Sequence, residues 1–152
     1  MRSTIELCKE IQTLLVEWKF PDGNEVRFDP ERNDIVIGKR NRGSLGKGYR
    51  AVAYSAFVIG LMRFCLRNSL PHPGFVVLDT PLNPYKGPDE GDDGKVNNET
   101  KIAFYKSLSN VNNIGQVVVL ENDNPPDEVQ QSTTYHHFSR NREIGRYGFY
   151  PL

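Results

Sequence analysis

The apolar positions of the chain change between helical and strand spacing. In residues 3–18 they recur every three or four residues, which predicts an amphipathic helix. Residues 25–28 and 34–38 have the pattern of two short strands, and the turn DPERN between them predicts a hairpin. Residues 49–68 are apolar on nearly every side, which predicts a long buried helix.

Two strands in the second half show no polar alternation. They are FVVLD at 75–79 and QVVVLEN at 116–122, and an amphipathic helical pattern at 99–111 precedes the second. Strands of this kind are typical of parallel sheets that helices cover on both faces. The alternation of helix and strand therefore predicts an α/β fold, with a mainly parallel sheet flanked by helices, an N-terminal helix and a small β-hairpin.

Composition indicates one globular domain over residues 1–152, since 38% of the residues are hydrophobic and 25% are charged. The two cysteines lie in helical patterns, so reduced thiols are expected rather than a disulfide framework. The first residues, MRSTIELCKEIQ, lack the apolar core of a signal peptide. The longest uncharged apolar run is too short to span a bilayer. We therefore expect a cytoplasmic protein without a membrane partner.

Charge is unevenly distributed, although the formal net charge is zero. Residues 71–130 have four basic and ten acidic side chains, a surrounding that favours a divalent cation. A basic cluster precedes the long helix and has no acid among its members: Lys39, Arg40, Arg42, Lys47 and Arg50. This cluster suits a polyanion such as a nucleotide phosphate or a nucleic acid, although a solvated loop explains it equally well.

Acidic residues follow both apolar strands. Asp79 ends the first strand, and Glu121 and Asp123 follow the second. The carboxyl ends of parallel strands meet at one edge of a sheet, where ligands bind in open α/β folds. We therefore expect Asp79 to lie at a ligand site, rather than merely to open the turn before Pro81.

The glycine-rich stretch GSLGKGYR, residues 43–50, is not a phosphate-binding loop of the pattern G-x-x-x-x-G-K-[ST]. Counting back from Lys47, the first glycine is replaced by Asn41. The position that requires serine or threonine is occupied by Gly48. The chain contains no other stretch that fits this Walker A pattern.

Four stretches resemble, taken together, the C-terminal lobe of ABC-type ATPase heads. They are LGKGYRA, HPGFVVLDTPL, QVVVLEN and GRYGFYP, and they extend over nearly the whole chain. The heads in question belong to SMC-like and RecN-like ATPases of DNA repair and phage defence. The resemblance implies the C-terminal half of a P-loop NTPase in residues 21–152. Residues 1–20 are then either the last turns of a coiled coil or a surface helix.

The resemblance also implies roles for single residues. Asp79 matches the Walker B aspartate, which helps to hold Mg²⁺ against the phosphates of ATP. The usual catalytic glutamate is replaced by Thr80, and Glu121 lies where a switch histidine is expected. The signature loop, which meets ATP across a head–head dimer, corresponds to Gly46, Lys47, Gly48 and Arg50. Gly46 takes the place of its usual serine, and Lys47 takes the place of a glycine. A Walker A-bearing N-terminal lobe, in the same or a separate chain, is the implied partner, and DNA is the implied target.

Two other functions remain open at this point. Asp79, Glu121 and Asp123 are the acids that a Mg²⁺-dependent nuclease similar to Toprim enzymes would use. A half-head of this kind is also suited to a non-catalytic assembly module.

Thr80 cannot act as a general base at neutral pH, and the acidic loop offers four substitutes for the missing glutamate: Asp89, Glu90, Asp92 and Asp93.

Overall fold

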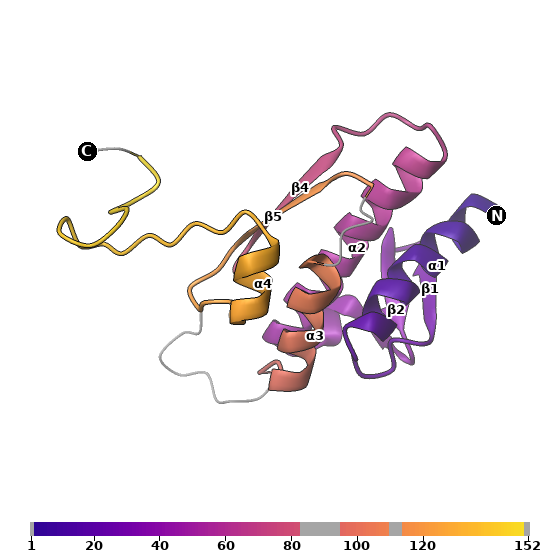
Figure 1. Ribbon diagram of the computed structural model, residues 1–152. Coiled ribbons are helices and arrows are strands. Elements are labelled where there is room, and N and C mark those ends of the chain that lie inside the picture. Colours follow the sequence, from indigo (N-terminus) through magenta and orange to yellow (C-terminus); the bar gives the residue numbers. More distant parts are fainter. Residues whose placement is uncertain (1, 83–94, 110–113, 151–152) are drawn as a thin grey trace.

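Two helices that cross at close range form the centre of the computed structural model, which describes residues 2–82, 95–109 and 114–150 (Figure 1). Helix α1 (Arg2–Glu17) packs along α2 (Lys47–Arg67). The predicted apolar stripe of α1 faces this contact, except for Ile5, which is exposed. The buried members of the stripe are Cys8, Ile11, Leu14, Leu15 and, just after the helix, Trp18. The first helix therefore contributes one buried side to the core, and its opposite side is exposed.

Helix α2 has a buried side, as its apolar sequence predicts, although Tyr54 on its outer side is 50% exposed. Among the described residues it is the one helix that is long and apolar enough to cross a membrane, with a mean hydropathy of 1.3. Its apolar side chains pack against α1 and the strands instead, and several of them are fully buried: Val52, Ala53, Ala56, Ile59 and Met62. The hydropathy of α2 is thus that of a core helix, which is consistent with a soluble protein.

The predicted hairpin is present and has a short third strand. Strand β1 (Val26–Asp29) pairs antiparallel with β2 (Asp34–Ile37), and β2 pairs with β3 (Arg40–Asn41). Ile35 and Ile37 of β2 belong to the same apolar core as the buried side chains of α1 and α2. A single 3₁₀ turn, η1 (Arg42–Ser44), then leads into α2. The small sheet therefore fixes where α2 begins.

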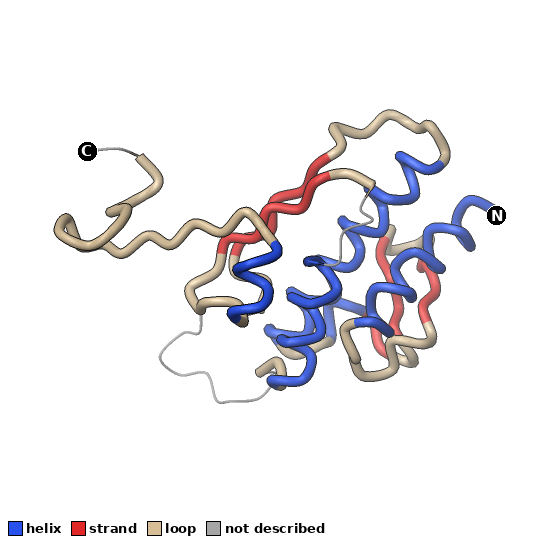
Figure 2. The backbone as a smooth tube through the Cα atoms, viewed as in Figure 1, coloured by secondary structure: helices blue, strands red, loops and turns tan. Residues whose placement is uncertain are grey.

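The two apolar strands pair in parallel, as the sequence predicts (Figure 2). Strand β4 (Phe75–Asp79) lies beside β5 (Gln116–Leu120), with Asp79 opposite Leu120. Helix α3 (Asn98–Ser109) makes the crossover between them and packs on α1 through Phe104, whose ring centroid lies 4.7 Å from that of Trp18. The mixed α/β class and the parallel pairing of these two strands are therefore confirmed. A mainly parallel sheet is not shown, because the other described strands form a three-stranded antiparallel sheet.

Within the described residues the parallel sheet differs from the prediction in one respect, because helices cover one of its faces. Val76, Leu78, Val117 and Val119 point into the core. On the other face Phe75 is 49% exposed and Val77 is 53% exposed, and Leu120 is also exposed. We call this surface the open face. The apolar run correctly indicated a strand that tolerates burial on both faces. In the described part of the chain one of these two faces is covered.

A short helix, α4 (Asp127–Ser132), follows β5, and residues 133–150 then leave the body of the molecule as an irregular tail (Figure 1). Residues 133–139 form no strand. Their one bridge joins Phe138 to Arg146 within the tail itself. The tail therefore adds no strand to the described sheets.

The closest approach of α1 and α2 depends on Gly60, and this dependence can be tested. A Cβ atom at Gly60 would lie 2.7 Å from Cγ1 of Ile11 and 3.2 Å from its backbone nitrogen. We expect Gly60→Ala to lower the free energy of unfolding by about 1–2 kcal/mol in urea denaturation, because overpacking outweighs the gain in helix propensity. Gly43→Ala is the control, since a Cβ there meets nothing within 4 Å. Equal stabilities of the two variants would contradict the close crossing.

Candidate functional site

Asp79 lies at the carboxyl end of β4 and its side chain is on the open face. Phe75, Val77 and Asp79 alternate with the core-facing residues of the strand, and Asp79 is exposed. The hydroxyl of Thr80 donates a hydrogen bond of 2.9 Å to Oδ1 of Asp79. An exposed carboxylate at a strand end is a suitable single ligand for a hard cation that keeps most of its water.

Thr80 follows Asp79 in a strained backbone conformation. Its φ is +49°, a left-handed value that is unusual for a β-branched residue. Its backbone N–H donates to the carbonyl oxygen of Leu120 at 2.8 Å, which extends the parallel ladder by one bond. The strand pairing therefore holds Thr80 in place. Strain of this kind is concentrated at functional sites in proteins.

Glu121 lies beside the same turn, so the structure brings the ends of the two strands together as predicted. One carboxylate oxygen of Glu121 accepts the backbone N–H of Leu82 at 2.7 Å, and the other accepts the N–H of Asn122 at 3.0 Å. Glu121 thereby ties the chain after β4 to the end of β5. This contact restrains the turn that contains Asp79 and Thr80.

Asp123 and Tyr105 complete the described surroundings of this edge. Asp123 lies 3.9 Å from Nζ of Lys101 on α3. The hydroxyl of Tyr105 is buried and has no hydrogen-bond partner among the described residues. Burial raises the pKa of Tyr105, and the nearby carboxylates of Glu121 and Asp123 raise it further, so the phenol stays protonated. Sequence patterns did not indicate Tyr105, because it falls on an ordinary amphipathic helix.

The described residues do not contain three histidine, cysteine or acidic side chains that could hold a metal ion together. Asp79, Glu121 and Asp123 therefore do not form the shared ligand set that a nuclease would need. The acids proposed as substitutes for the catalytic glutamate, Asp89, Glu90, Asp92 and Asp93, lie outside the described residues.

The glycine-rich loop forms the start of α2, as the signature-loop interpretation requires. Gly46 is the N-cap, with φ −57° and ψ 153°, and it offers no side-chain cap. Gly46, Lys47 and Arg50 are exposed, whereas Gly48 is buried in the first turn. Strand β4 runs back along α2, so its carboxyl end points toward the amino end of the helix (Figure 1). Backbone N–H groups at such a helix start suit an anion.

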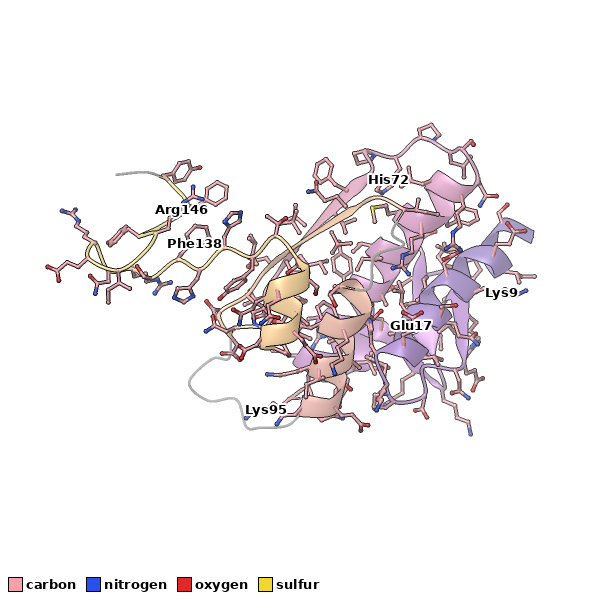
Figure 3. The ribbon with its side chains drawn as sticks, in the orientation of Figure 1. Lys9, Glu17, His72, Lys95, Phe138 and Arg146 are labelled. Carbon is pink, nitrogen blue, oxygen red and sulfur yellow. The ribbon has the colours of Figure 1, made fainter. Side chains whose placement is uncertain are left out.

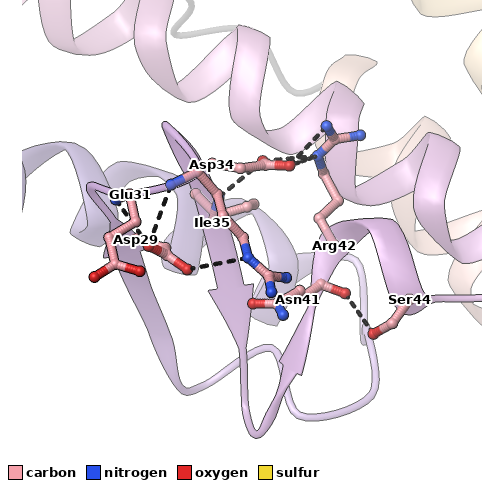
Figure 4. Close-up of polar contacts among 8 residues, drawn as sticks. Asp29, Glu31, Asp34, Ile35, Asn41, Arg42 and Ser44 are labelled. Carbon is pink, nitrogen blue, oxygen red and sulfur yellow. Dashed lines mark hydrogen bonds and ion pairs between the residues drawn. The ribbon is translucent and has the colours of Figure 1, made fainter.

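Two arginines of the basic cluster are paired with acids, and Figure 4 shows the pair of Arg42 with Asp34 of the small sheet. Arg42 makes a bidentate contact with Asp34, in which Nη2 lies 2.8 Å from Oδ2 and Nε lies 2.9 Å from Oδ1. Arg40 lies 3.8 Å from Asp22. In the sequence no acid lies among these basic residues. The pairing of β2 with β3 brings Asp34 to Arg42, and the turn after α1 supplies Asp22. The cluster is therefore less positive than its sequence indicates.

A scan against protein-family models found none that matches this chain, and a search of curated proteins found no relative.

The pairing of Asp34 with Arg42 predicts a loss of stability in acid. Burial opposes the ionisation of Asp34, but hydrogen bonds from Arg42 and from the N–H of Ile35 outweigh it and hold the pKa below its ordinary value of 3.8. A carboxylate with a lowered pKa stabilises the fold above its unfolded pKa, and this contribution disappears as the pH falls through the folded pKa. We expect Asp34→Asn to cost about 1–2 kcal/mol at pH 7, by urea denaturation.

The cost of Asp34→Asn should begin to shrink below about pH 4, where the unfolded carboxyl takes up protons, and should disappear as the pH falls through the lower folded pKa. Asp22→Asn is the matched control, since its contact with Arg40 is longer and more exposed, and it should change stability little at any pH. A cost of Asp34→Asn that stays constant from neutral pH down to pH 3 would contradict the ion pair.

The strain at Thr80 predicts that glycine is tolerated better than threonine. Thr80→Gly should raise the free energy of unfolding by about 1 kcal/mol, because glycine adopts a positive φ without a steric penalty. Thr80→Val keeps the branched side chain and the strain but lacks the hydroxyl that contacts Asp79, so it should bring no stabilisation. Urea denaturation of both variants measures the difference, and greater stability of the valine variant would count against strain.

Proposed function

We propose that this chain is the C-terminal lobe of an SMC-like ABC-type ATPase head that acts in DNA repair or phage defence in the cytoplasm. In this proposal Asp79 and the loop from Gly46 to Arg50 contribute to ATP binding and hydrolysis across a head dimer. The main support is the half-covered parallel sheet, which has an acid at its carboxyl edge on the open face. Sheets made of parallel strands are normally covered on both faces, so a lobe with this surface is suited to a partner lobe.

The residues fit the cofactors that the proposal requires. Asp79 would hold Mg²⁺ as an oxygen ligand, and the uncapped amino end of α2 would face a phosphate of ATP. When bound, Mg²⁺ neutralises charge on the phosphates during transfer. Lys47 and Arg50 add positive charge beside the helix start. The phosphate cradle itself must come from a Walker A-bearing lobe, because the chain lacks that motif.

Thr80 and Glu121 have limited roles in this proposal. Thr80 orients the carboxylate of Asp79 through its hydroxyl, and it replaces the usual glutamate without being able to act as a base. Glu121 restrains the turn through two backbone N–H groups. The group that orients the attacking water then comes from the partner lobe or from the acidic loop.

The proposal predicts that hydrolysis needs both a Walker A-bearing partner and Asp79. The chain, captured from a lysate of its source cells in Mg-ATP, should bring down a protein with the pattern G-x-x-x-x-G-K-[ST], or the native polypeptide should itself contain it. Phosphate release by the reconstituted complex should fall about a hundredfold with Asp79→Asn. Asp123→Asn is the matched control at the neighbouring strand end, and it should leave turnover unchanged.

Other outcomes separate the alternative functions. ATP turnover by the isolated chain, or turnover of the complex that Asp79→Asn does not change, would contradict the proposal. Mg²⁺-dependent DNA cleavage by the isolated chain that Asp79→Asn abolishes would indicate a nuclease. Complex formation that is indifferent both to ATP and to Asp79→Asn would indicate an assembly module, which the open face also supports.

A further inference from the structure

The C-terminal tail is closed into a loop by its own hydrogen bonds. The backbone N–H of Ser139 donates to the carbonyl oxygen of Arg146 at 2.8 Å, and the N–H of Arg140 donates to that of Tyr147 at 3.1 Å. Between them, Oδ1 of Asn141 accepts the N–H of Glu143 at 3.0 Å. These bonds give residues 139–147 a defined shape, although this part of the chain stands away from the helices and sheets (Figure 1).

Aromatic rings gather on this loop and are left open to solvent. The ring of Phe149 lies edge-to-face against Phe138 at 6.1 Å and against Tyr150 at 5.4 Å. Phe149 is 67% exposed and Tyr150 is 80% exposed, and Tyr147 is exposed as well. Exposed apolar surface that is grouped rather than scattered is typical of a binding site.

Arginines accompany the rings. The guanidinium of Arg146 lies 5.4 Å from the ring centroid of Phe138 (Figure 3). The guanidinium of Arg142 lies 6.0 Å from the ring centroid of Tyr147. Arg140 is a third basic side chain, and Glu143 is the one acidic side chain in residues 133–150. The tail therefore has a net charge of +2 alongside its rings.

This combination of rings and arginines restricts the chemistry of the ligand. An apolar protein groove that took up the rings would also bury the neighbouring guanidinium groups, which is costly unless each is paired. The unpaired nucleobases of a single-stranded nucleic acid offer flat faces to the rings. The phosphates of its backbone offer hydrogen-bond acceptors to the arginines. Duplex DNA is less suitable, because its bases are already stacked and the described tail has no helix or strand ribbon to enter a groove.

We propose that residues 138–150 bind single-stranded nucleic acid. Bases stack on Tyr147, Phe149 and Tyr150, and phosphates contact Arg140, Arg142 and Arg146. This site lies outside the proposed nucleotide site and does not depend on it, because it needs neither ATP nor a Walker A-bearing partner.

Fluorescence anisotropy tests the proposal with the full chain, without ATP, and a labelled oligothymidylate of about 15 nucleotides. We expect the single strand to bind more tightly than a duplex of equal length. If the three arginines contact phosphates, log K should fall against log salt with a slope of about −2.

Variants separate the two kinds of contact. The pair Tyr147→Leu and Tyr150→Leu keeps apolar bulk but removes the rings, and it should weaken binding about tenfold or more while leaving the salt slope unchanged. Tyr147→Phe with Tyr150→Phe keeps the rings and should retain binding. Arg140→Gln with Arg142→Gln should weaken binding and reduce the slope to about −0.7. Phe75→Leu and Lys9→Gln, at exposed sites away from the tail, are the controls.

Several results would overturn the proposal. One is no binding of the single strand by the native chain at about 100 µM in low salt. Another is binding that the tail variants do not change, which would indicate the basic loop before α2 instead. Tail-dependent binding to vesicles of phosphatidylserine, without binding to oligothymidylate, would assign the tail to a membrane surface. Equal loss in the leucine and phenylalanine variants would point to a disrupted loop rather than to stacking.

Discussion

The burial of α2 is the interaction on which the rest of the structure depends. The helix packs against α1, the small sheet and the inner face of the β4–β5 sheet, and these elements share one apolar core. Gly60 lets the backbone of α1 approach closely, so the two helices form a single support. Two parts of the candidate site are positioned by this packing. Asp79 ends a strand that packs on α2, and Gly46 begins the helix itself. Their relative position therefore follows from core packing rather than from a flexible loop.

Much of the fold could be predicted from the sequence, because its elements have strong local patterns. The stripe of α1, the all-round apolar character of α2 and the hairpin turn each depend on neighbouring residues alone, and each is present. The parallel pairing of β4 and β5 could also be predicted, since a helix separates two apolar strands. The open face could not, because the sequence of a strand shows which residues tolerate burial and not whether anything covers them.

The candidate site was predicted in part, for a related reason. Strand register places the ends of β4 and β5 at one edge, so the proximity of Asp79 and Glu121 follows from the sequence pattern. The bidentate contact of Arg42 with Asp34 needs the turn between β2 and β3, which the polar loop did not suggest. The positive φ of Thr80 could not be predicted either, because threonine is branched at Cβ and rarely adopts a left-handed backbone conformation. Contacts that depend on tertiary pairing, and strained backbone angles, leave little signal in the local sequence pattern.

The open face and the strained turn meet at Asp79, and this coincidence has a physical consequence. A partner that covers Phe75 and Val77 would remove apolar surface from water and would stabilise the lobe by mass action. Asp79 lies on the same face, so the same partner would enclose its carboxylate. The turn is already held by Glu121 and by the N–H bond from Thr80 to Leu120, which lowers the cost of ordering it on association. Under the proposed function, completion of the sheet and completion of the nucleotide site are then one event. In that proposal the chain alone would be inactive, because Asp79, although positioned, would lack the surface that brings the phosphates to it.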